Sequence, residues 1–180
     1  MIETPHPQVK PRMKPLNFKK WINDNRHLLK PPVGNQQIWE DTEFMITVVG
    51  GPNARTDYHI NQGEEFFYQV EGDINLRLWM DDKPQDFPIA EGEIFLLPPN
   101  VPHSPQRPPN TVGLVIERKR LKDEIDSLVW FCDKCHSQVY KESFHLTDIV
   151  KQFPPLFDRF YNTPENCTCK KCGTKITKAK

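Results

Sequence analysis

The sequence has little glycine, no surplus of charge of either sign and no long apolar run. Eight glycines stand against 18 prolines among 180 residues, and Lys plus Arg equal Asp plus Glu at 24 each. Because proline interrupts helices and central strands, we expect many short elements with rigid corners. The balanced charge argues against DNA, RNA or an acidic membrane as a partner. No apolar run reaches about 18 residues, and residues 1–15 lack the apolar core of a signal peptide, so no membrane association is expected.

Cysteine is absent before residue 132. All five cysteines lie between 132 and 172, grouped as CDKC and CTCKKC. This clustering indicates metal ligation in a reducing compartment rather than a disulfide framework. We therefore expect a soluble, cytoplasmic protein.

The chain divides into three regions. Residues 1–16, with four prolines, predict a flexible N-terminal arm. Asn17 is a candidate N-cap for a helix over residues 18–29. Short β-branched and aromatic runs then alternate with turn signals, which predicts an all-β barrel or sandwich over residues 17–120. Those runs are QQIWE, FMITVV, EFFYQV, INLRLWM, DFPIA, EIFLLP and TVGLVIE.

Residues 121–180 predict a polar C-terminal arm. Within it, TDIVKQFPPLFDRFYNTPEN (147–166) predicts two short helical pieces broken at Pro154–Pro155, because proline lacks the N–H that a helix interior needs. Part of this segment, residues 143–161, is a candidate lid. Core packing is the favoured role for Phe157 and Phe160.

Two spaced blocks within the β region suggest a metal site. The first is His-x5-Glu-x6-Gly, and the second is Gly-x5-Pro-x-Asn-x2-His. Each histidine alone is more often a core or surface residue, and the pair Glu64–Glu65 is more often a solvated turn. Together the blocks resemble the paired motifs of the cupin superfamily. That resemblance implies a single jelly-roll barrel with a few short helices. The residues concerned are His59, Glu65, Gly72, Gly92, Pro98, Asn100 and His103.

The departures from the common cupin pattern are informative. Asn61 replaces a second histidine, which leaves His59, Glu65 and His103. Two histidines and one carboxylate suit non-haem Fe(II) and oxygen chemistry, and the x5 spacing favours Glu65 over Glu64. Asn100 replaces a turn glycine and tolerates the left-handed conformation.

Three further charged residues fit a substrate site, although loop charges are the simpler reading of Arg55 and Glu117. Arg107 follows His103 closely and could form a fork for a substrate carboxylate. Arg55 precedes His59 and could face the position where oxygen or another anion binds. Glu117 ends an apolar run, where a raised pKa would suit a general base that takes a proton from a phenol.

Longer stretches, including GGPNxRTDYH, EEFFYQ, GDxNLxLW and GEIFLLPPNVPHSPQRP, resemble the 3-hydroxyanthranilate 3,4-dioxygenase family from about residue 17 to 173. The resemblance implies an iron(II)-dependent, extradiol-type enzyme that acts on 3-hydroxyanthranilate and O2. The expected product is 2-amino-3-carboxymuconate semialdehyde, the precursor of quinolinate in NAD biosynthesis from tryptophan by the kynurenine pathway. A homodimer is also implied.

Residue roles carried over from the family agree with the direct interpretation. His59, Glu65 and His103 are the expected catalytic iron ligands, and Arg55 is expected beside the oxygen site. The expected catalytic residues are Arg55, Arg107 and Glu117. The substrate contacts implied are Glu65, Arg107, Glu117 and Asn35.

The cysteines predict a second metal site of four thiolates. Cys132-x2-Cys135 and Cys169-x2-Cys172 form two knuckles of the spacing that a tetrahedral site needs. The resemblance implies a rubredoxin-like iron site, and a structural zinc site remains the alternative. Cys167 is a less favoured ligand because only Cys169 gives the x2 spacing, so Cys167 is expected to be a free thiol.

Two other functional classes remain open at this stage. One is a non-catalytic cupin that senses a small acid or sugar, which would need no open metal face and no Glu117. The other is a zinc-ribbon module that contacts nucleic acid. The balanced charge disfavours the latter, and the lysines near the C-terminus read more simply as a solvated tail.

Overall fold

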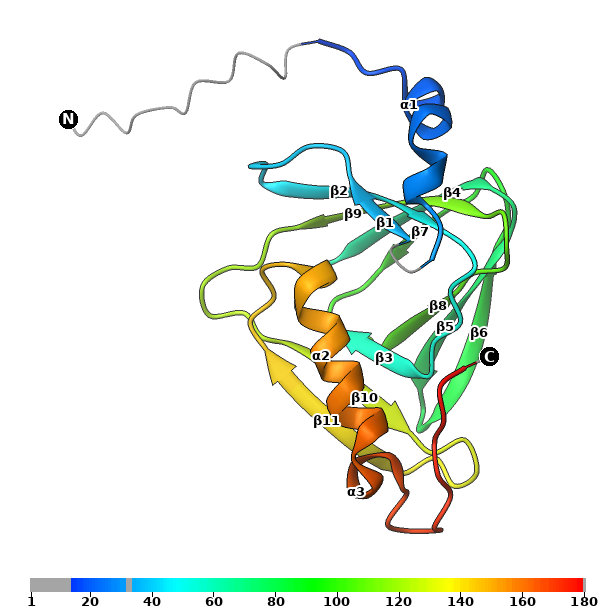
Figure 1. The fold of residues 1–180 in the computed structure, drawn as a ribbon, viewed down its shortest axis with the longest axis vertical. Coiled ribbons are helices and arrows are strands. Elements are labelled where there is room, and N and C mark those ends of the chain that lie inside the picture. The colour runs from blue at the N-terminus through cyan, green and yellow to red at the C-terminus, as the bar shows by residue number, and fades with distance from the viewer. Residues whose placement is uncertain (1–13, 32–33, 180) are drawn as a thin grey trace, which may run out of the picture.

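The computed structural model describes residues 14–31 and 34–179, so most of the expected N-terminal arm lies outside the described residues. Two antiparallel sheets enclose a barrel (Figure 1). The five-stranded sheet has the order β1-β2-β9-β4-β7. Its strands are β1 (Asn35–Gln37), β2 (Phe44–Gly50), β9 (Val112–Arg118), β4 (Glu65–Glu71) and β7 (Ile94–Leu97).

The six-stranded sheet lies opposite and has the order β11-β10-β3-β8-β5-β6. Side chains from both sheets, such as Phe67 of β4 and Leu76 of β5, share one buried cluster, which fills the barrel interior. The all-β cupin barrel predicted from the sequence is therefore confirmed. The strands of this sheet are β11 (Gln138–Phe144), β10 (Asp126–Phe131), β3 (Asp57–Ile60), β8 (His103–Gln106), β5 (Ile74–Met80) and β6 (Lys83–Ile89).

Alternating burial along the strands fixes which side chains enter the barrel. In β4, Glu65, Phe67 and Gln69 are buried and the residues between them are partly exposed. Because strand side chains alternate between faces, a one-residue shift would move Glu65 to the outside. The register of β4 with β9 pairs Glu65 with Glu117 and Phe67 with Val115, so Glu117 enters the interior beside Glu65.

Four of these strands were not expected from the sequence. β3 and β8 are only four residues long and carry polar side chains, so they lack an apolar run. β10 and β11 fall in the region that was expected to be an arm. β10 pairs with β3 along four residues, so the boundary expected at residue 120 does not coincide with the edge of the sheet.

The N-terminal helix covers part of the outer face of the five-stranded sheet. Asn17 caps helix α1 (Phe18–Asn25), accepting from the backbone N–H of Lys20 at 2.9 Å, which confirms the expected N-cap. A 3-10 turn, η1 (Arg26–Leu28), follows the helix. Ile22 packs with Val48 and Val112 of the sheet.

The segment with two prolines forms one helix, not two. Helix α2 (Ile149–Asn162) is continuous through Pro154 and Pro155, so the predicted break is wrong. Both prolines are exposed, whereas Phe153, Leu156 and Phe160 are buried in a cluster with Trp130 of β10. Packing of this apolar face holds the helix together despite the missing N–H groups. A short helix α3 (Pro164–Cys167) follows.

The turn positions predicted from the second block are confirmed. Asn100 has φ +64°, and Gly92 has φ +87°. Asparagine and glycine tolerate this left-handed region better than other residues, which explains these residue types at the corners of the barrel.

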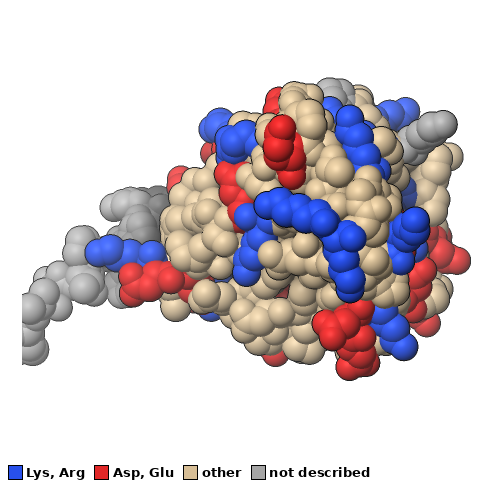
Figure 2. All heavy atoms as spheres, turned by 90° about the horizontal axis from the view of Figure 1, so that it is seen from below, with Lys and Arg blue, Asp and Glu red and all other residues tan. Residues whose placement is uncertain are grey.

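Charged side chains of both signs are mixed on the face that Figure 2 shows. Figure 2, which views the molecule from below, shows basic side chains interspersed with acidic and neutral ones. Among the described residues, no helix has the length and apolar character that crossing a membrane requires.

Phe160→Ala should lower the free energy of unfolding by about 3–5 kcal/mol, because the deletion leaves a cavity in the core. Phe160 is fully buried and its ring stacks on Trp130 with centroids 4.1 Å apart. Urea denaturation of the metal-loaded protein measures the change. Asp158→Ala, at an exposed position of the same helix, is the control. Equal midpoints for the two variants would contradict this account of the α2 packing.

Candidate active site

Three potential metal ligands converge inside the barrel. His59 of β3 and His103 of β8 are directly paired across their sheet. Glu65 begins β4 in the facing sheet. One ligand atom from each residue lies within 4.8 Å of the other two, and all three side chains are buried. The structure thus brings together the three residues that the two sequence blocks singled out.

The donor atoms lie close enough together to share one ion. His103 Nε2 lies 2.9 Å from Glu65 Oε2, yet that buried oxygen has no hydrogen bond of acceptable geometry. His103 Nδ1 donates to Val101 O at 3.0 Å, which leaves Nε2 as the inward nitrogen. Burial tends to raise the pKa of Glu65, but His103 and His59 lower it to about 2, so the carboxylate is the ionised form that binds metals. The donor set fits a divalent metal such as Fe(II).

A buried ion network supports His59. Its Nε2 lies 2.6 Å from Asp126 Oδ2, which leaves the other ring nitrogen of His59 free. Arg120 donates to both oxygens of Asp126, at 2.7 and 2.8 Å. Sequence interpretation missed both residues, because Arg120 lies in a segment taken as a connector. The signal for Asp126 was an acid adjoining the apolar run LVWF.

Glu117 lies beside this network. Its Oε2 accepts from Arg120 Nη1 at 2.6 Å, and Asn61 Nδ2 lies 3.5 Å from the same oxygen. Burial first, and then the charge of Glu65, raise the pKa of Glu117 to about 8, although Arg120 opposes the shift. The raised pKa brings Glu117 into the range that suits proton transfer near neutral pH.

A cavity of about 510 Å³ adjoins the three ligands. Asn35, Arg55, Arg107 and Glu117 all line it, so the residues expected at the substrate site face one space. Apolar side chains, among them Phe67 and Val115, form the floor. A site of this size with convergent polar groups suits a small aromatic acid.

Arg107 is a buried cation that makes no ion pair with a carboxylate of the described residues. Its Nε makes no hydrogen bond within the described residues, and Nη1 donates to the side-chain oxygen Oε1 of Gln69 at a long 3.3 Å. Burial first, and then repulsion from Arg55, lower the pKa of Arg107 to about 10. Gly113 makes this position possible, because a Cβ there would lie 2.6 Å from Arg107 Nη1. Gln69 and Gly113 were not identified from the sequence.

Arg55 is paired differently. It makes an ion pair with Asp57, which is almost completely buried, and its guanidinium lies 5.6 Å from the ring centroid of Phe153. Asp57 therefore holds Arg55 on the wall of the cavity, whereas Arg107 makes no such ion pair within the described residues.

Helix α2 closes one side of the cavity. Ile149, Phe153, Phe157 and Tyr161 line it, and the Tyr161 hydroxyl shares a hydrogen bond with Thr56 beside Arg55. The segment considered as a lid is thus a wall of the cavity. Phe160 points into the core instead, as expected, whereas Phe157 contacts both the core cluster and the cavity.

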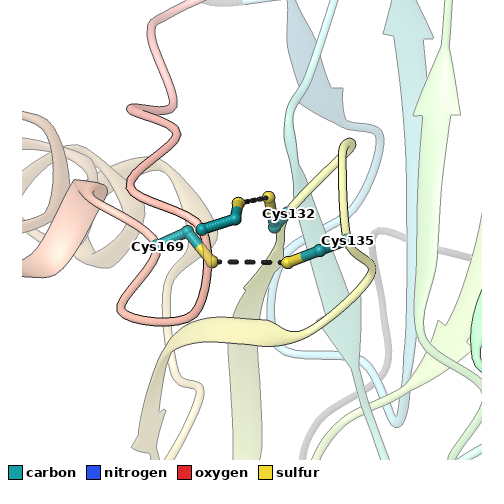
Figure 3. Close-up of side chains that lie close together, drawn as sticks. Cys132, Cys135 and Cys169 are labelled. Atoms are coloured by element: carbon teal, nitrogen blue, oxygen red, sulfur yellow. Dashed lines mark hydrogen bonds between the residues drawn. The ribbon is translucent and has the colours of Figure 1, made fainter.

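The four cysteines meet at the far end of β10. Figure 3 shows Cys135 and Cys169 pointing toward each other, with Cys132 close by. Cys132 and Cys172 sulfurs are 3.5 Å apart, as are those of Cys135 and Cys169. A tetrahedral site with metal–sulfur bonds of about 2.3 Å has sulfurs about 3.8 Å apart, so this spacing fits a bound ion.

Cys167 lies apart from this cluster. Its side chain is completely buried in the core with Trp130 and Phe160. Its sulfur lies 3.7 Å from the Pro164 carbonyl oxygen. A buried thiol behaves as a small apolar side chain, so Cys167 is the free thiol expected from the sequence and is not placed for easy oxidation.

The double-sheet barrel and its two-histidine, one-carboxylate cluster define a metal-dependent cupin of the dioxygenase class. A family model described as 3-hydroxyanthranilic acid dioxygenase matches residues 11–161. The chain belongs to this family, which confirms the resemblance.

Individual relatives agree with the family match. A Burkholderia cenocepacia protein named 3-hydroxyanthranilate 3,4-dioxygenase is 52% identical over 161 residues, covering 89% of this chain and 91% of the relative. A Ruegeria pomeroyi protein of the same name is 53% identical over 163 residues, covering 90% and 91%. Among solved structures, a cupin-2 domain containing protein from Shewanella frigidimarina gives a TM-score of 0.44 at 20% identity, covering 55% of this chain and 92% of that one.

Cys169→Ser should reduce the bound metal from about two ions per chain to about one, because three thiolates remain where a tetrahedral site needs four. Cys167→Ser should keep both ions, since Cys167 lies outside the cluster. Elemental analysis of the purified variants measures the metal content. Loss of an ion from the Cys167 variant alone would reverse the ligand assignment.

Proposed function

We propose that the chain is an iron(II)-dependent 3-hydroxyanthranilate 3,4-dioxygenase. It opens the ring of 3-hydroxyanthranilate with O2 to give 2-amino-3-carboxymuconate semialdehyde, the precursor of quinolinate in NAD biosynthesis. Membership of the family and the names of the relatives support this assignment. The observation that carries it within the chain is a three-ligand cluster beside a cavity with an unpaired arginine.

His59, Glu65 and His103 would hold the iron. When bound, iron(II) supplies a Lewis-acidic, redox-active centre at which the aromatic substrate and O2 react. Asp126 would orient the imidazole of His59, and the Val101 carbonyl would orient His103. These contacts fix the ligands before the ion binds.

Arg107 would bind the substrate carboxylate. Its burial without an acidic partner is costly, and a carboxylate would satisfy the free Nε as one of two parallel hydrogen bonds. Bound in this way, the ring is oriented with its hydroxyl and amine toward the metal ligands. The same contact would exclude substrates that lack the acid.

Glu117 would accept the proton of the substrate hydroxyl. Because Arg120 and Asn61 hold Oε2, the other oxygen, Oε1, is the atom to which we assign the proton. Arg55 would lie beside the oxygen site, and Asn35, which also lines the cavity, would contact the substrate. The apolar wall from α2 would limit the access of water.

The four-cysteine site would hold iron or zinc in a structural role. It joins the loop after β10 to the segment after α3. The segment from residue 163 onward is short and loop-rich, so a metal would stabilise it where a core of its own would be insufficient.

We propose that the chain divides into three regions. These are an arm over residues 1–16, a barrel over residues 17–120 and a C-terminal region over residues 121–180. The grouped, unpaired cysteines also support a reducing, cytoplasmic setting.

A homodimer would form through the outer face of the five-stranded sheet. Helix α1 covers only part of this face, and Phe44, Ile94 and Leu96 are 51%, 65% and 55% exposed. An apolar group of this kind on a sheet indicates a contact surface, and a second copy is the partner the family implies. A monomer mass in light scattering would contradict the dimer.

The direct test is to load the protein with iron(II) without air, add 3-hydroxyanthranilate and then admit O2. Oxygen uptake matched by the ring-opened chromophore would support the proposal. Tight binding of the acid without oxygen uptake would instead identify a sensor. Absence of both would exclude the proposed substrate.

Arg107→Ala should lower kcat/KM for 3-hydroxyanthranilate by about 100-fold or more, because charge-assisted hydrogen bonds to the carboxylate are lost. Turnover of 2-aminophenol, which has no carboxylate, should change little. Arg77→Ala removes a partly exposed arginine of β5 that does not line the cavity, and serves as the control. Equal losses for both substrates would exclude the carboxylate role.

Glu117→Gln should retain iron and substrate but lower kcat by about 100-fold or more, the usual contribution of a general base. A base must be deprotonated, so with a pKa raised to about 8 the wild-type rate should increase with pH and level off above that value. The variant should lose this increase. Glu64→Gln, at the exposed neighbour of Glu65, should keep it; a wild-type pH profile in Glu117→Gln would refute the base role.

A further inference from the structure

The C-terminal tail returns from the four-cysteine site to the substrate cavity. In Figure 1 the red segment leaves the end of the molecule near α3 and runs back along it to the label C. Lys178 and Ala179 are among the residues that line the cavity. The sequence alone gave no reason to place these residues near the site, because a lysine-rich end reads as a solvated tail.

The knuckle of the four-cysteine site determines the path of this tail. Gly173, with φ +74°, turns the chain, and its N–H donates to Cys169 O at 2.8 Å. The Cys169 N–H in turn donates to Thr174 O at 2.8 Å. These bonds close the loop that carries Cys169 and Cys172. The direction of the tail therefore depends on how these two thiolates are held.

Ile176 then anchors the tail to the core. Its N–H donates to Cys167 O at 2.8 Å, and its side chain is 7% exposed in the cluster that contains Trp130 and Phe160. Only one residue separates this anchor from Lys178. A shift of the knuckle would therefore move Lys178 with it.

Lys178 lies at the rim of the cavity over an aromatic ring of its wall. Its Nζ is 5.5 Å from the ring centroid of Tyr161, and the side chain is exposed. The acids that line the cavity, Asp57, Glu65 and Glu117, are each engaged by an arginine or histidine. An exposed ammonium at the rim therefore adds a positive charge on the path of an anionic substrate.

We propose that Lys178 is a substrate-recruiting residue at the cavity entrance, and that the four-cysteine site acts on catalysis by holding Lys178 there. The ligand class is an aromatic carboxylate, so this inference rests on the proposed function. The lysine attracts the anion before Arg107 binds it inside. The second metal site thereby acquires a role in substrate capture besides stabilising its own segment.

The first experiment measures the Kd of 3-hydroxyanthranilate for the iron-loaded enzyme by calorimetry without air, and KM in air. Lys178→Ala should raise both by about threefold at low ionic strength, with kcat unchanged, because a screened surface charge affects capture more than chemistry. The effect should vanish at high salt and for 2-aminophenol. Lys175→Ala, at an exposed tail lysine that does not line the cavity, should match the wild type.

The second experiment tests the coupling to the cysteine site. Cys172→Ser should raise Kd as Lys178→Ala does, and the double variant should show no further increase. Ile176→Ser keeps all four cysteines and should give the same result, so the test survives if Cys172→Ser fails to fold. Additive effects of the Cys172 and Lys178 substitutions on Kd would overturn the coupling. Wild-type affinity in both Cys172→Ser and Ile176→Ser would also overturn it.

The outcomes separate this inference from the proposed reaction. Binding without turnover in the wild type, with the Lys178→Ala effect intact, would end the dioxygenase proposal and leave the recruiting role. Turnover in the wild type with an unchanged Kd in Lys178→Ala would support the dioxygenase proposal and overturn the recruiting role of Lys178. No binding of the acid at all would overturn both.

Discussion

The structure depends on the convergence of two imidazoles and a carboxylate, all buried, inside a barrel. Burying these groups is unfavourable unless each has a partner. The chain meets this constraint with Asp126 behind His59, the Val101 carbonyl behind His103 and the two histidines around Glu65. Within the described residues Glu65 Oε2 accepts no hydrogen bond, and this is the oxygen that a metal ion would satisfy.

The need for a partner also applies to the buried charged side chains around the cavity. Arg120 joins Glu117 to Asp126, so the proposed base and the support of a proposed metal ligand share one guanidinium. Arg55 is neutralised by Asp57, but Arg107 has no such partner. Arg107, whose Nε makes no hydrogen bond within the described residues, is therefore the arginine to which we assign the substrate carboxylate.

The C-terminal region is part of the site in two ways. β10 supplies Asp126 and completes the sheet beside β3, and α2 supplies the apolar wall. Both elements pack through the cluster around Trp130, which also includes Cys167 and Ile176 of the C-terminal segment. A metal at the cysteines would therefore stabilise the elements that border the cavity, although it lies apart from the three-ligand cluster.

Residue types and spacing were sufficient to predict the barrel, the three candidate ligands, the cysteine knuckles and the turn at Asn100, because each follows from local backbone geometry or a short motif. Arg107 and Glu117 could be proposed for the same reason. The roles of Arg120, Asp126, Gln69 and Gly113 depend on strand register, which pairs residues far apart in the chain. The continuous helix through Pro154 and Pro155, and the return of Lys178 to the cavity, were likewise decided by tertiary packing. Burial of an apolar face can outweigh a local helix breaker, and no local pattern records where a tail comes to lie.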